Sequence, residues 1–405
     1  MACVCLYLQL HQPFRLRRYS VFDTDPHYFD DLRNAETCRG VAQRSYLPAG
    51  RILLRLLEQL GDRLKLALSF SGTVLDQFEA FAPEVTDLYQ RLVQTGLVDV
   101  LAEPYHHSLA ALYSAEEFKA QVALHRRRVE GVFGVTPRVL RNTELIYHGR
   151  LARLIEETGH SGVLVEATER ELAGRAAGRV YAASAAPELR LLPRHTRLSD
   201  DIAHRFNDRS WSGWPLTAEK LAAWVDEAAG ESGNPSSPEE AVIGLFLNLA
   251  VFGDRHWADT GILEFLRHFP ERILASPRGH RFVTPAELCD RPPAALLDFP
   301  VPTSWASPER DTSAWLGNAM QVNAMHELYR LEGPVKASSD PAVLEDWRRL
   351  TSCDHSYYMS TKYWSEVDVT RESNPYESPY DAYINFMNVL DNIASRVGAT
   401  GRRGL

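Results

Sequence analysis

The sequence is poor in cysteine, carries no net positive charge and has no long hydrophobic segment. The five cysteines, Cys3, Cys5, Cys38, Cys289 and Cys353, are scattered and form no Cys-x-x-Cys pair. This pattern excludes a disulfide framework and a typical zinc motif, and it favours reduced thiols in the cytoplasm. With 44 basic and 53 acidic residues the net charge is −9, which argues against nucleic-acid binding and suits a neutral or cationic ligand.

No segment has the length or hydrophobicity of a membrane helix. The apolar stretch in the opening text MACVCLYLQLHQPF covers about eight residues and has no basic region before it, so it predicts a first strand rather than a signal or membrane helix. Hydrophobic residues make up 45% of the chain and charged residues 24%, as in ordinary globular proteins. A chain of 405 residues can hold one large α/β domain and an accessory domain.

Short apolar segments alternate with helical patterns over the first two thirds of the sequence. The predicted strands are 4–10, 64–70, 98–101, 139–140, 162–165 and 241–252. Helices are predicted over 51–60, after the capping residue Ser114, and after Thr284, which precedes a proline at the first helical position. This repetition predicts a parallel sheet and, at this length, an α/β barrel or near-barrel.

A proline-rich segment, 291–304, predicts a junction between domains. Beyond it, helical patterns over 311–331, 341–350 and 380–397 predict a helical domain packed on the barrel. We therefore expect a barrel domain over 1–295 and a helical domain over 296–400 that contributes to the cleft. The polar segment 230–239 reads as a loop, 185–208 fits no period and predicts a long functional loop, and the tail from 398 reads as frayed.

The most informative strand is 241–252, which is apolar apart from Gly244 and Asn248. Such a run predicts a strand buried on both faces of a parallel sheet, and the helical spacing over 259–269 predicts the helix after it. Folds of this kind keep their chemistry at the carboxyl ends of the strands. Asn248 and the segment 252–257 are therefore candidate site residues.

Polar residues also follow four other predicted strands. They are His11-Gln12-Pro13, Ser71-Gly72, Glu103 to His107, and Arg141-Asn142-Thr143-Glu144. Taken singly, each pattern is as well explained by a loop, a helix cap or a paired carboxylate. Together with Asn248 they predict a cluster at one mouth of the barrel.

The residues at these strand ends resemble glycoside hydrolase family 57, close to its α-amylase branch. The resemblance runs in order from residue 6 to about residue 390. It is carried by LYLQLHQPFRLRRYSVFD, SGTVLDQFE, LAEPYHHSL, LRNTELIY, FGDRHWADTGILEFLRHFP, SWASPERDTSAWLGNAMQ and CDHSYYMSTKYWS. It implies an incomplete (β/α)7 barrel followed by a helical domain, and a retaining mechanism on α-glucans.

The resemblance assigns the nucleophile to Glu144 and reveals a departure at the second catalytic position. Aligned through FGDRHW, the acid/base Asp of the family falls on Asn248, and a Glu two residues later falls on Ala250. Retaining glycosidases need a second carboxyl about 5–5.5 Å from the nucleophile to protonate the leaving oxygen. An amide has no labile proton, so glucan hydrolysis is expected to be weak or absent. Loss of both carboxylates favours a natural non-acidic site over a laboratory substitution at Asn248.

Another acid could stand in for the missing carboxyl, and Asp254 and His256 are the nearest candidates in sequence. For sugar binding, the aromatic and polar candidates are His11, Glu103, His106, Trp257, Trp305, Trp315, Asp354 and His355. Core packing is the alternative explanation for the tryptophans, and a helix-end ion pair is the alternative for Asp354 and His355.

Two functional classes follow from these residues. One is an α-amylase or 4-α-glucanotransferase with unusual acid/base chemistry, and the other is a pseudoenzyme that binds an α-glucan or a protein partner. A metal-dependent deacetylase would need an Asp and two His at metal spacing, which His11, His106 and His107 do not supply. We expect malto-oligosaccharide as the ligand, and no metal, cofactor, nucleic acid or membrane partner. The sequence does not predict the oligomeric state.

Overall fold

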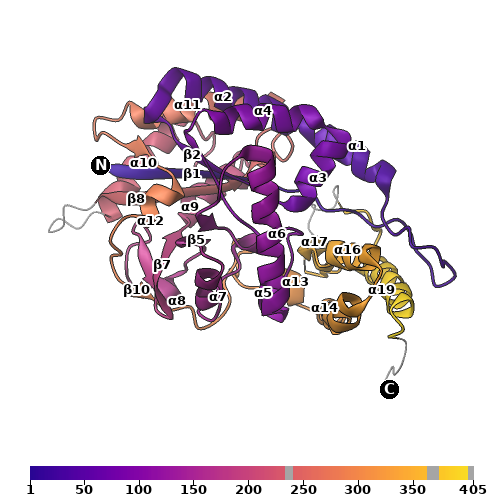
Figure 1. Cartoon of the computed structure of the whole chain (residues 1–405). Coiled ribbons are helices and arrows are strands. Elements are labelled where there is room, and N and C mark those ends of the chain that lie inside the picture. The colour runs from indigo at the N-terminus through magenta and orange to yellow at the C-terminus, as the bar shows by residue number, and fades with distance from the viewer. Residues whose placement is uncertain (233–239, 363–373, 400–405) are drawn as a thin grey trace.

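The computed structural model describes residues 1–232, 240–362 and 374–399 (Figure 1). Most of the predicted loop 230–239 and most of the predicted frayed tail lie outside these residues. No helix in the described part of the chain combines the length and apolar character needed to cross a membrane. All five cysteines are free and buried.

The first sheet is built around β1 (Ala2–Leu10), which is buried along all nine residues. It pairs in parallel with β2 (Leu66–Phe70) and β8 (Ala241–Asn248), in the order β3-β2-β1-β8. The short strands β3 (Val98–Val100) and β9 (Arg281–Phe282) pair in parallel with β2 and β1. Helices cover the outer face of this sheet (Figure 1). Its other face packs against residues of the second sheet, among them Val139, Leu164 and Leu192, so the strands are buried on both faces and are continuously apolar.

The second sheet has the order β10-β6-β7-β5-β4. Its strands are β10 (Leu296–Leu297), β6 (Tyr181–Ala183), β7 (Ala186–Pro193), β5 (Gly162–Val165) and β4 (Val139–Leu140). The β6–β7 pair is antiparallel, and the other pairs are parallel.

The two sheets approach each other at both edges without forming one closed hydrogen-bonded barrel in the described residues. On one side, Ala102 bridges to Leu140 next to β3. On the other, His195 N–H donates to the Gly244 carbonyl at 2.8 Å. Gly244 is required here because a Cβ would lie 2.6 Å from the Pro193 carbonyl oxygen. The α/β class is therefore confirmed, and the described residues form no closed barrel.

Helices connect most of the strands. They are α1 (Asp31–Val41), α2 (Leu47–Leu60), α3 (Gly72–Phe81), α4 (Pro83–Gln94), α5 (Ala110–Tyr113), α6 (Ala115–Phe133), α7 (Leu151–Glu157), α8 (Glu169–Leu172), α9 (Thr196–Ala203), α10 (Ala218–Ser232), α11 (Ile262–Leu274) and α12 (Pro285–Cys289). Shorter helical turns are η1 (Ala42–Tyr46), η2 (Gly61–Arg63), η3 (Thr143–Leu145), η4 (Leu249–Val251) and η5 (Ala258–Thr260). The predicted caps are confirmed, since the Ser114 hydroxyl accepts from Glu117 N–H at 3.1 Å and Thr284 forms a capping box with Glu287.

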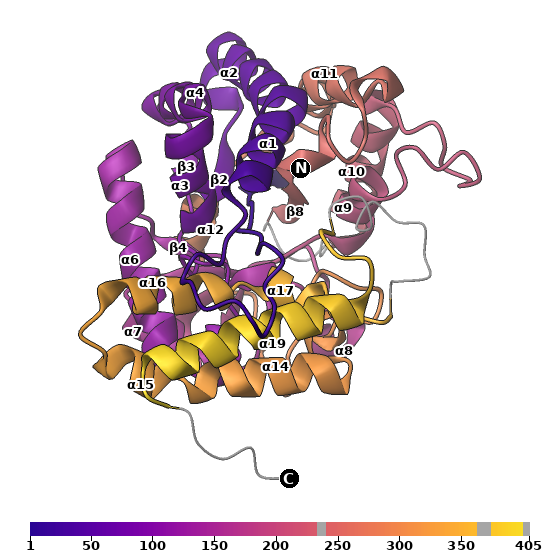
Figure 2. The same ribbon diagram turned by 90° about the vertical axis from the view of Figure 1, so that its right-hand side faces the viewer.

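The C-terminal helices form a layer of their own, with α14, α16 and α19 side by side (Figure 2). They are α13 (Ser313–Leu316), α14 (Ala319–Arg330), α15 (Glu332–Ala337), α16 (Pro341–Leu350), α17 (Cys353–Tyr357) and α19 (Pro379–Arg396). Their core includes Trp347 and Phe386 together with Phe14 and Tyr28 from the segment after β1. The N-terminal segment is thus part of the helical layer as well as of the sheet.

Three sequence predictions of local structure were wrong. The strand predicted over 241–252 ends at Asn248, because the Asn248 side chain caps η4 through the Ala250 amide. The segment predicted as a loop over 185–208 contains β7 and α9, whose first turn is capped by His195. The single helix predicted over 311–331 is interrupted before Asn318, which caps α14.

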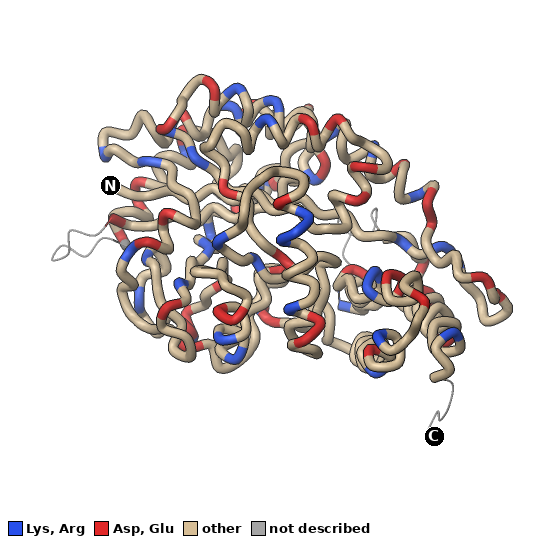
Figure 3. The backbone as a smooth tube through the Cα atoms, in the orientation of Figure 1, with Lys and Arg blue, Asp and Glu red and all other residues tan. Residues whose placement is uncertain are grey.

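Acidic and basic residues are interspersed along the chain (Figure 3). Many of them form exposed ion pairs within one helix, such as Glu264 with Arg267 at 3.1 Å and Glu327 with Arg330 at 2.8 Å. This mixture of signs is typical of a solvated surface.

Candidate active site

A cavity of about 250 Å³ opens where β8, the end of β4 and the C-terminal helices meet. Residues from all three regions line it, among them Glu144, Asn248, Trp305, Trp315, Cys353 and Asp354. The predicted clustering of Glu144 and Asn248 is therefore seen in the structure, and the helical layer supplies one wall of the cavity.

Glu144 lies in a strained turn directly after β4. Its φ and ψ are 51° and 30°, and the next residue, Leu145, also has a positive φ of 52°. Such a conformation costs a non-glycine residue about 1–3 kcal/mol and persists only where neighbours enforce it. Here the Ser304 hydroxyl donates to the Glu144 carbonyl at 2.7 Å, and Asn142 Nδ2 donates to the Ile146 carbonyl at 2.7 Å. The turn presents the Glu144 carboxylate to the cavity.

Two ring N–H groups hold the Glu144 carboxylate. His107 Nε2 donates to Oε1 at 2.8 Å, and the indole Nε1 of Trp305 donates to Oε2 at 2.8 Å. Burial alone would raise the pKa of Glu144, but the hydrogen bond and charge of His107, the charge of Arg141 and the Trp305 bond lower it to about 2. Glu144 is therefore ionised at neutral pH and is positioned by two donors, as a nucleophile requires.

His107 lies between two carboxylates. Its Nδ1 is 3.3 Å from Glu103 Oε2, and its Nε2 contacts Glu144. Burial favours the neutral ring, yet the hydrogen bonds to Glu103 and Glu144 prevail and raise the pKa of His107 to about 9. Glu103 is buried beside Arg141, whose Nη1 lies 3.5 Å from it. The predicted ligand Glu103 thus lies beneath the cavity and supports His107.

Asp354 projects into the cavity from α17 and is tied to His11. The two side chains lie 2.9 Å apart, and the Ser352 hydroxyl donates to the same carboxylate oxygen at 2.7 Å. Burial disfavours the charged carboxylate, but the charge and hydrogen bond of His11 hold the pKa of Asp354 well below its usual range. His11 also stacks on His107, with ring centroids 3.9 Å apart. The polar residues after β1, β3 and β4 are therefore joined in one network.

Asn248 occupies the last position of β8, paired in register with Gln9 of β1. Its side-chain oxygen accepts from the Ala250 N–H at 2.9 Å, which leaves the amide nitrogen as the donor toward a ligand. Ala250 has no polar side chain. This corner of the cavity can donate a hydrogen bond to a sugar oxygen but cannot transfer a proton.

A buried charge cluster next to the cavity was not predicted. Arg194, directly after β7, lies 3.1 Å from Glu166 and 2.7 Å from Asp200, and Arg310 pairs with the other oxygen of Asp200. The Arg194 guanidinium also lies 5.5 Å from the ring centroid of Trp305. Glu166 directly follows the predicted strand 162–165. Polar residues after other predicted strands were taken as site candidates, and the same criterion would have included Glu166.

Of the eight predicted binding residues, only Trp305, Trp315 and Asp354 line the cavity. His11 and Glu103 contact Asp354 and His107 from beside it, and the other three lie apart from it. His106 and His355 are buried, and neither ring nitrogen of His106 has a hydrogen-bond partner in the described residues. Trp257 is 60% exposed on the surface. Trp305 and Trp315 line the cavity, although Trp315 is itself buried.

The two alternative acids suggested by sequence proximity are directed elsewhere. Asp254 forms a forked ion pair with Arg44, at 3.0 and 2.7 Å. His256 is buried, and its Nε2 contacts the Ala203 carbonyl at 3.1 Å. Neither side chain is among the residues that line the cavity. Their nearness to Asn248 in sequence therefore does not make them proton donors at Glu144.

Comparison with known proteins agrees with this architecture. Residues 5–298 match the profile described as "Glycosyl hydrolase family 57". A Methanocaldococcus jannaschii protein named "Putative alpha-amylase" is 34% identical over 397 residues, covering 94% of this chain and 82% of its own length.

Solved structures share the fold at low sequence identity. The 4-alpha-glucanotransferase from Thermococcus litoralis is 15% identical with a TM-score of 0.71, over 98% of this chain and 60% of the glucanotransferase. A branching enzyme from Thermococcus kodakaraensis is 14% identical with a TM-score of 0.69, over 100% of this chain and 92% of its own. From the sequence match and the fold together, the chain belongs to glycosyl hydrolase family 57.

Proposed function

We propose that this protein binds an α-glucan such as a malto-oligosaccharide in the cavity, with Glu144 as the nucleophile and Asn248 at the acid/base position. Hydrolysis is then weak or absent. On this proposal the two sheets correspond to an incomplete (β/α)7 barrel, whose strand β10 lies just past the expected boundary at residue 295. The helical domain that follows completes the cleft. The free cysteines suit a cytoplasmic location.

The observation that carries the proposal is the charge state of the cavity carboxylates. Glu144 and Asp354 line the cavity, and both have pKa values lowered by their histidine partners, so neither holds a proton near neutral pH. Burial raises the pKa of the Cys353 thiol well above its usual range, which makes it a weak acid. Efficient general acids have a pKa near the working pH, and none of these three groups meets that condition.

Trp305 supports sugar binding as a fixed aromatic wall. Its indole N–H is bound to Glu144, and the Arg141 guanidinium lies 5.0 Å from its ring centroid. Aromatic side chains combined with a few polar groups are the usual lining of sugar sites. The amide of Asn248 and the carboxylate of Asp354 can bond sugar hydroxyls on either side.

A retaining glycosidase first forms a glycosyl ester and then hydrolyses it, and the proposal predicts that only the first step proceeds, with an activated donor. Attack of a Glu144 oxygen on the anomeric carbon forms a glycosyl ester and expels the leaving group. A sugar alkoxide leaves poorly without a proton, whereas fluoride leaves as an anion and needs none. Water must then be deprotonated to cleave the ester, and Asn248 cannot accept that proton. A glycosyl-enzyme formed from a fluoride donor should therefore accumulate.

Intact-mass spectrometry after incubation with α-maltosyl fluoride tests this chemistry. The expected result is a gain of one maltosyl group on the wild type and no gain on Glu144→Gln. Calorimetry with maltotetraose tests binding separately. A protein that binds no sugar at millimolar concentration and forms no adduct would contradict the proposal and leave the partner-binding pseudoenzyme.

A second candidate is an active α-amylase or 4-α-glucanotransferase that uses another acid. The name of the M. jannaschii relative favours it. It requires a cavity group that delivers a proton in place of Asn248, and Cys353 is the cavity thiol that retains one. Starch hydrolysis by the wild type that is lost in Cys353→Ala would support this candidate.

A further inference from the structure

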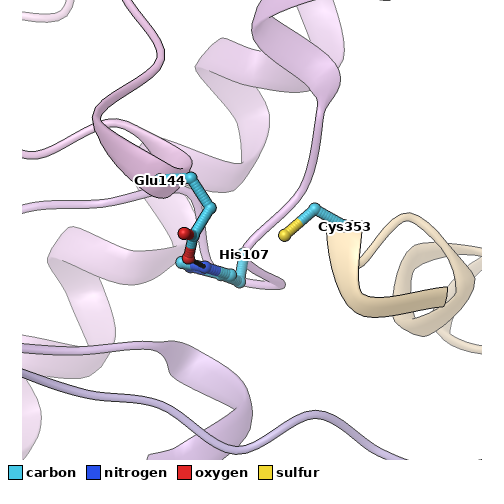
Figure 4. A group of neighbouring side chains, drawn as sticks. All are labelled: His107, Glu144 and Cys353. Carbon is cyan, nitrogen blue, oxygen red and sulfur yellow. Dashed lines mark hydrogen bonds and ion pairs between the residues drawn. The ribbon is translucent and has the colours of Figure 1, made fainter. Parts of the chain in front are cut away.

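Three side chains from distant parts of the sequence bring potential metal ligands together beside the cavity, which Glu144 and Cys353 line. His107 comes from the segment after β3, Glu144 from the turn after β4, and Cys353 from the first turn of α17. A ring nitrogen, a carboxylate oxygen and a sulfur atom of these residues lie within 4.8 Å of one another. In Figure 4 the sulfur of Cys353 points toward the other two side chains.

The donor set is that of a zinc-type ion. Zinc binds cysteine sulfur at about 2.3 Å and histidine nitrogen or carboxylate oxygen at about 2.0–2.2 Å, which places tetrahedral ligands roughly 3.3–3.6 Å apart. His107 Nε2 and Glu144 Oε1 are now 2.8 Å apart. An ion between them requires this pair to open and the sulfur to approach by about 1 Å, movements within reach of side-chain rotation. Three protein ligands leave a fourth position open to the cavity.

The surroundings of His107 already match those of a metal-bound histidine. Its Nδ1 lies 3.3 Å from the buried Glu103, and its Nε2 is directed at Glu144. Metal-binding histidines typically donate their other N–H to a carboxylate in this way. Glu103 and Asp354 also supply negative charge against Arg141, whose Nη2 lies 3.8 Å from Glu144. Binding replaces one proton on His107 and one on Cys353 with the metal ion.

We propose that His107, Glu144 and Cys353 form a binding site for one divalent ion of the zinc class. The metal site is inferred from these three ligands alone, whereas its effect on catalysis rests on the proposed function. A bound ion occupies the carboxylate of Glu144, which lines the cavity. It therefore blocks glycosyl-ester formation reversibly, and zinc and the sugar donor compete.

Titration with Co²⁺ in place of Zn²⁺ tests the site without any activity assay. The metal-free protein, washed with a chelator and kept reduced, should bind one Co²⁺ with a Kd below about 100 µM and show a thiolate-to-cobalt absorption band. Cys353→Ala should abolish the band, and His107→Gln should weaken binding at least 10-fold. Cys38→Ala, which removes a buried thiol from α1, should leave binding unchanged.

The outcomes separate this proposal from the proposed function. No saturable Co²⁺ binding, or a band that persists in Cys353→Ala, overturns the metal site. Far-ultraviolet circular dichroism shows whether each variant is folded. If His107→Gln is not folded, the result for Cys353→Ala alone decides the test. Maltotetraose calorimetry in chelator reports on sugar binding independently. Cobalt binding without sugar binding leaves the metal site intact, whereas sugar binding without cobalt binding overturns only the metal site.

Discussion

The side-chain oxygen of Asn248 accepts a hydrogen bond from the backbone N–H of Ala250 at 2.9 Å. This bond ends β8 and caps the turn that follows, so Asn248 has a structural role that an aspartate could also fill. An aspartate in the same position would accept the same N–H, which lowers the pKa of a carboxyl group. Restoring the acid therefore requires more than one substitution.

Asn248→Asp combined with Ala250→Glu should raise malto-oligosaccharide hydrolysis by about 10²-fold or more, because proton transfer to the leaving oxygen contributes about 10²–10⁴-fold. The hydrogen bond from the backbone N–H of residue 250 lowers the pKa of the new aspartate. The new glutamate places a negative charge near that aspartate, which raises its pKa again and favours its protonated form. Asn248→Asp alone should gain less. Reducing-sugar release from maltoheptaose measures all three proteins.

The matched control for this experiment is Glu144→Gln in the doubly substituted protein, where the gain should disappear with the nucleophile. If the wild type cleaves the oligosaccharide as fast as the double variant, a different group supplies the proton and our interpretation of Asn248 is wrong.

A second prediction concerns the leaving group. In the wild type, release of fluoride from α-maltosyl fluoride should exceed cleavage of maltotriose by at least about 10²-fold, because only the second reaction needs a proton donor. The first turnover should be faster than later ones, since the ester is then cleaved without a base. A fluoride electrode and stopped-flow sampling measure both phases. Equal rates on the two substrates would contradict the absence of an acid.

The pair His107–Glu144 also predicts how stability depends on pH. Histidine has a pKa of 6.5 when unperturbed and about 9 in His107, so the stabilisation is complete below pH 6.5 and is lost as pH rises through 9. Glu144 has a lowered pKa, so its contribution is present above 4.5 and is lost as pH falls through about 2. Thermal denaturation from pH 6 to 9.5 should show a falling midpoint that is flatter in His107→Gln. A wild-type midpoint that rises over this range would contradict a charged His107.

Sugar binding should depend on Trp305 more than on Trp257. Trp305 lines the cavity, whereas Trp257 is 60% exposed and outside its lining. Trp305→Ala removes the aromatic wall and the N–H donor to Glu144. Because removing an aromatic contact costs about 1–3 kcal/mol, sugar binding should weaken at least 10-fold. Trp257→Ala should change sugar binding less than 3-fold. Maltotetraose calorimetry compares the two variants. Equal losses would extend the site to the surface around Trp257.

The sequence predicted the elements that repeat and the residues at their ends, because apolar runs and caps are local properties. The strand ends at Glu144 and Asn248 were assigned to one mouth, and they line one cavity. The pairing of Asp354 with His11 could not be predicted, since the partners lie 343 residues apart and meet only through tertiary packing. For the same reason the approach of Cys353 to His107 was missed. Asp254 was considered as an acid because it is close to Asn248 in sequence, but its side chain pairs with Arg44 instead.

Arg194 provides a test of how the cavity wall is held. Arg194 and Glu166 are almost fully buried and lie 3.1 Å apart, so Arg194→Met leaves a buried carboxylate without its main partner. Removing one member of such a pair costs about 3–5 kcal/mol. Arg267→Met breaks an exposed pair with Glu264 and should cost less than about 1 kcal/mol. Urea denaturation of both variants measures the difference.

The chemistry of Glu166 gives the Arg194 experiment a second readout. Burial already raises the pKa of Glu166 while Arg194 opposes that rise, so removing Arg194 raises the pKa further. Arg194→Met should therefore regain stability toward acidic pH, as Glu166 takes up a proton and its buried charge disappears. Glu166→Gln in the same background removes the unpaired charge and should restore part of the loss at neutral pH. The single and double variants could instead lose the same stability. That result would mean that Arg194 supports the wall by packing against Trp305, 5.5 Å away, and not through its charge.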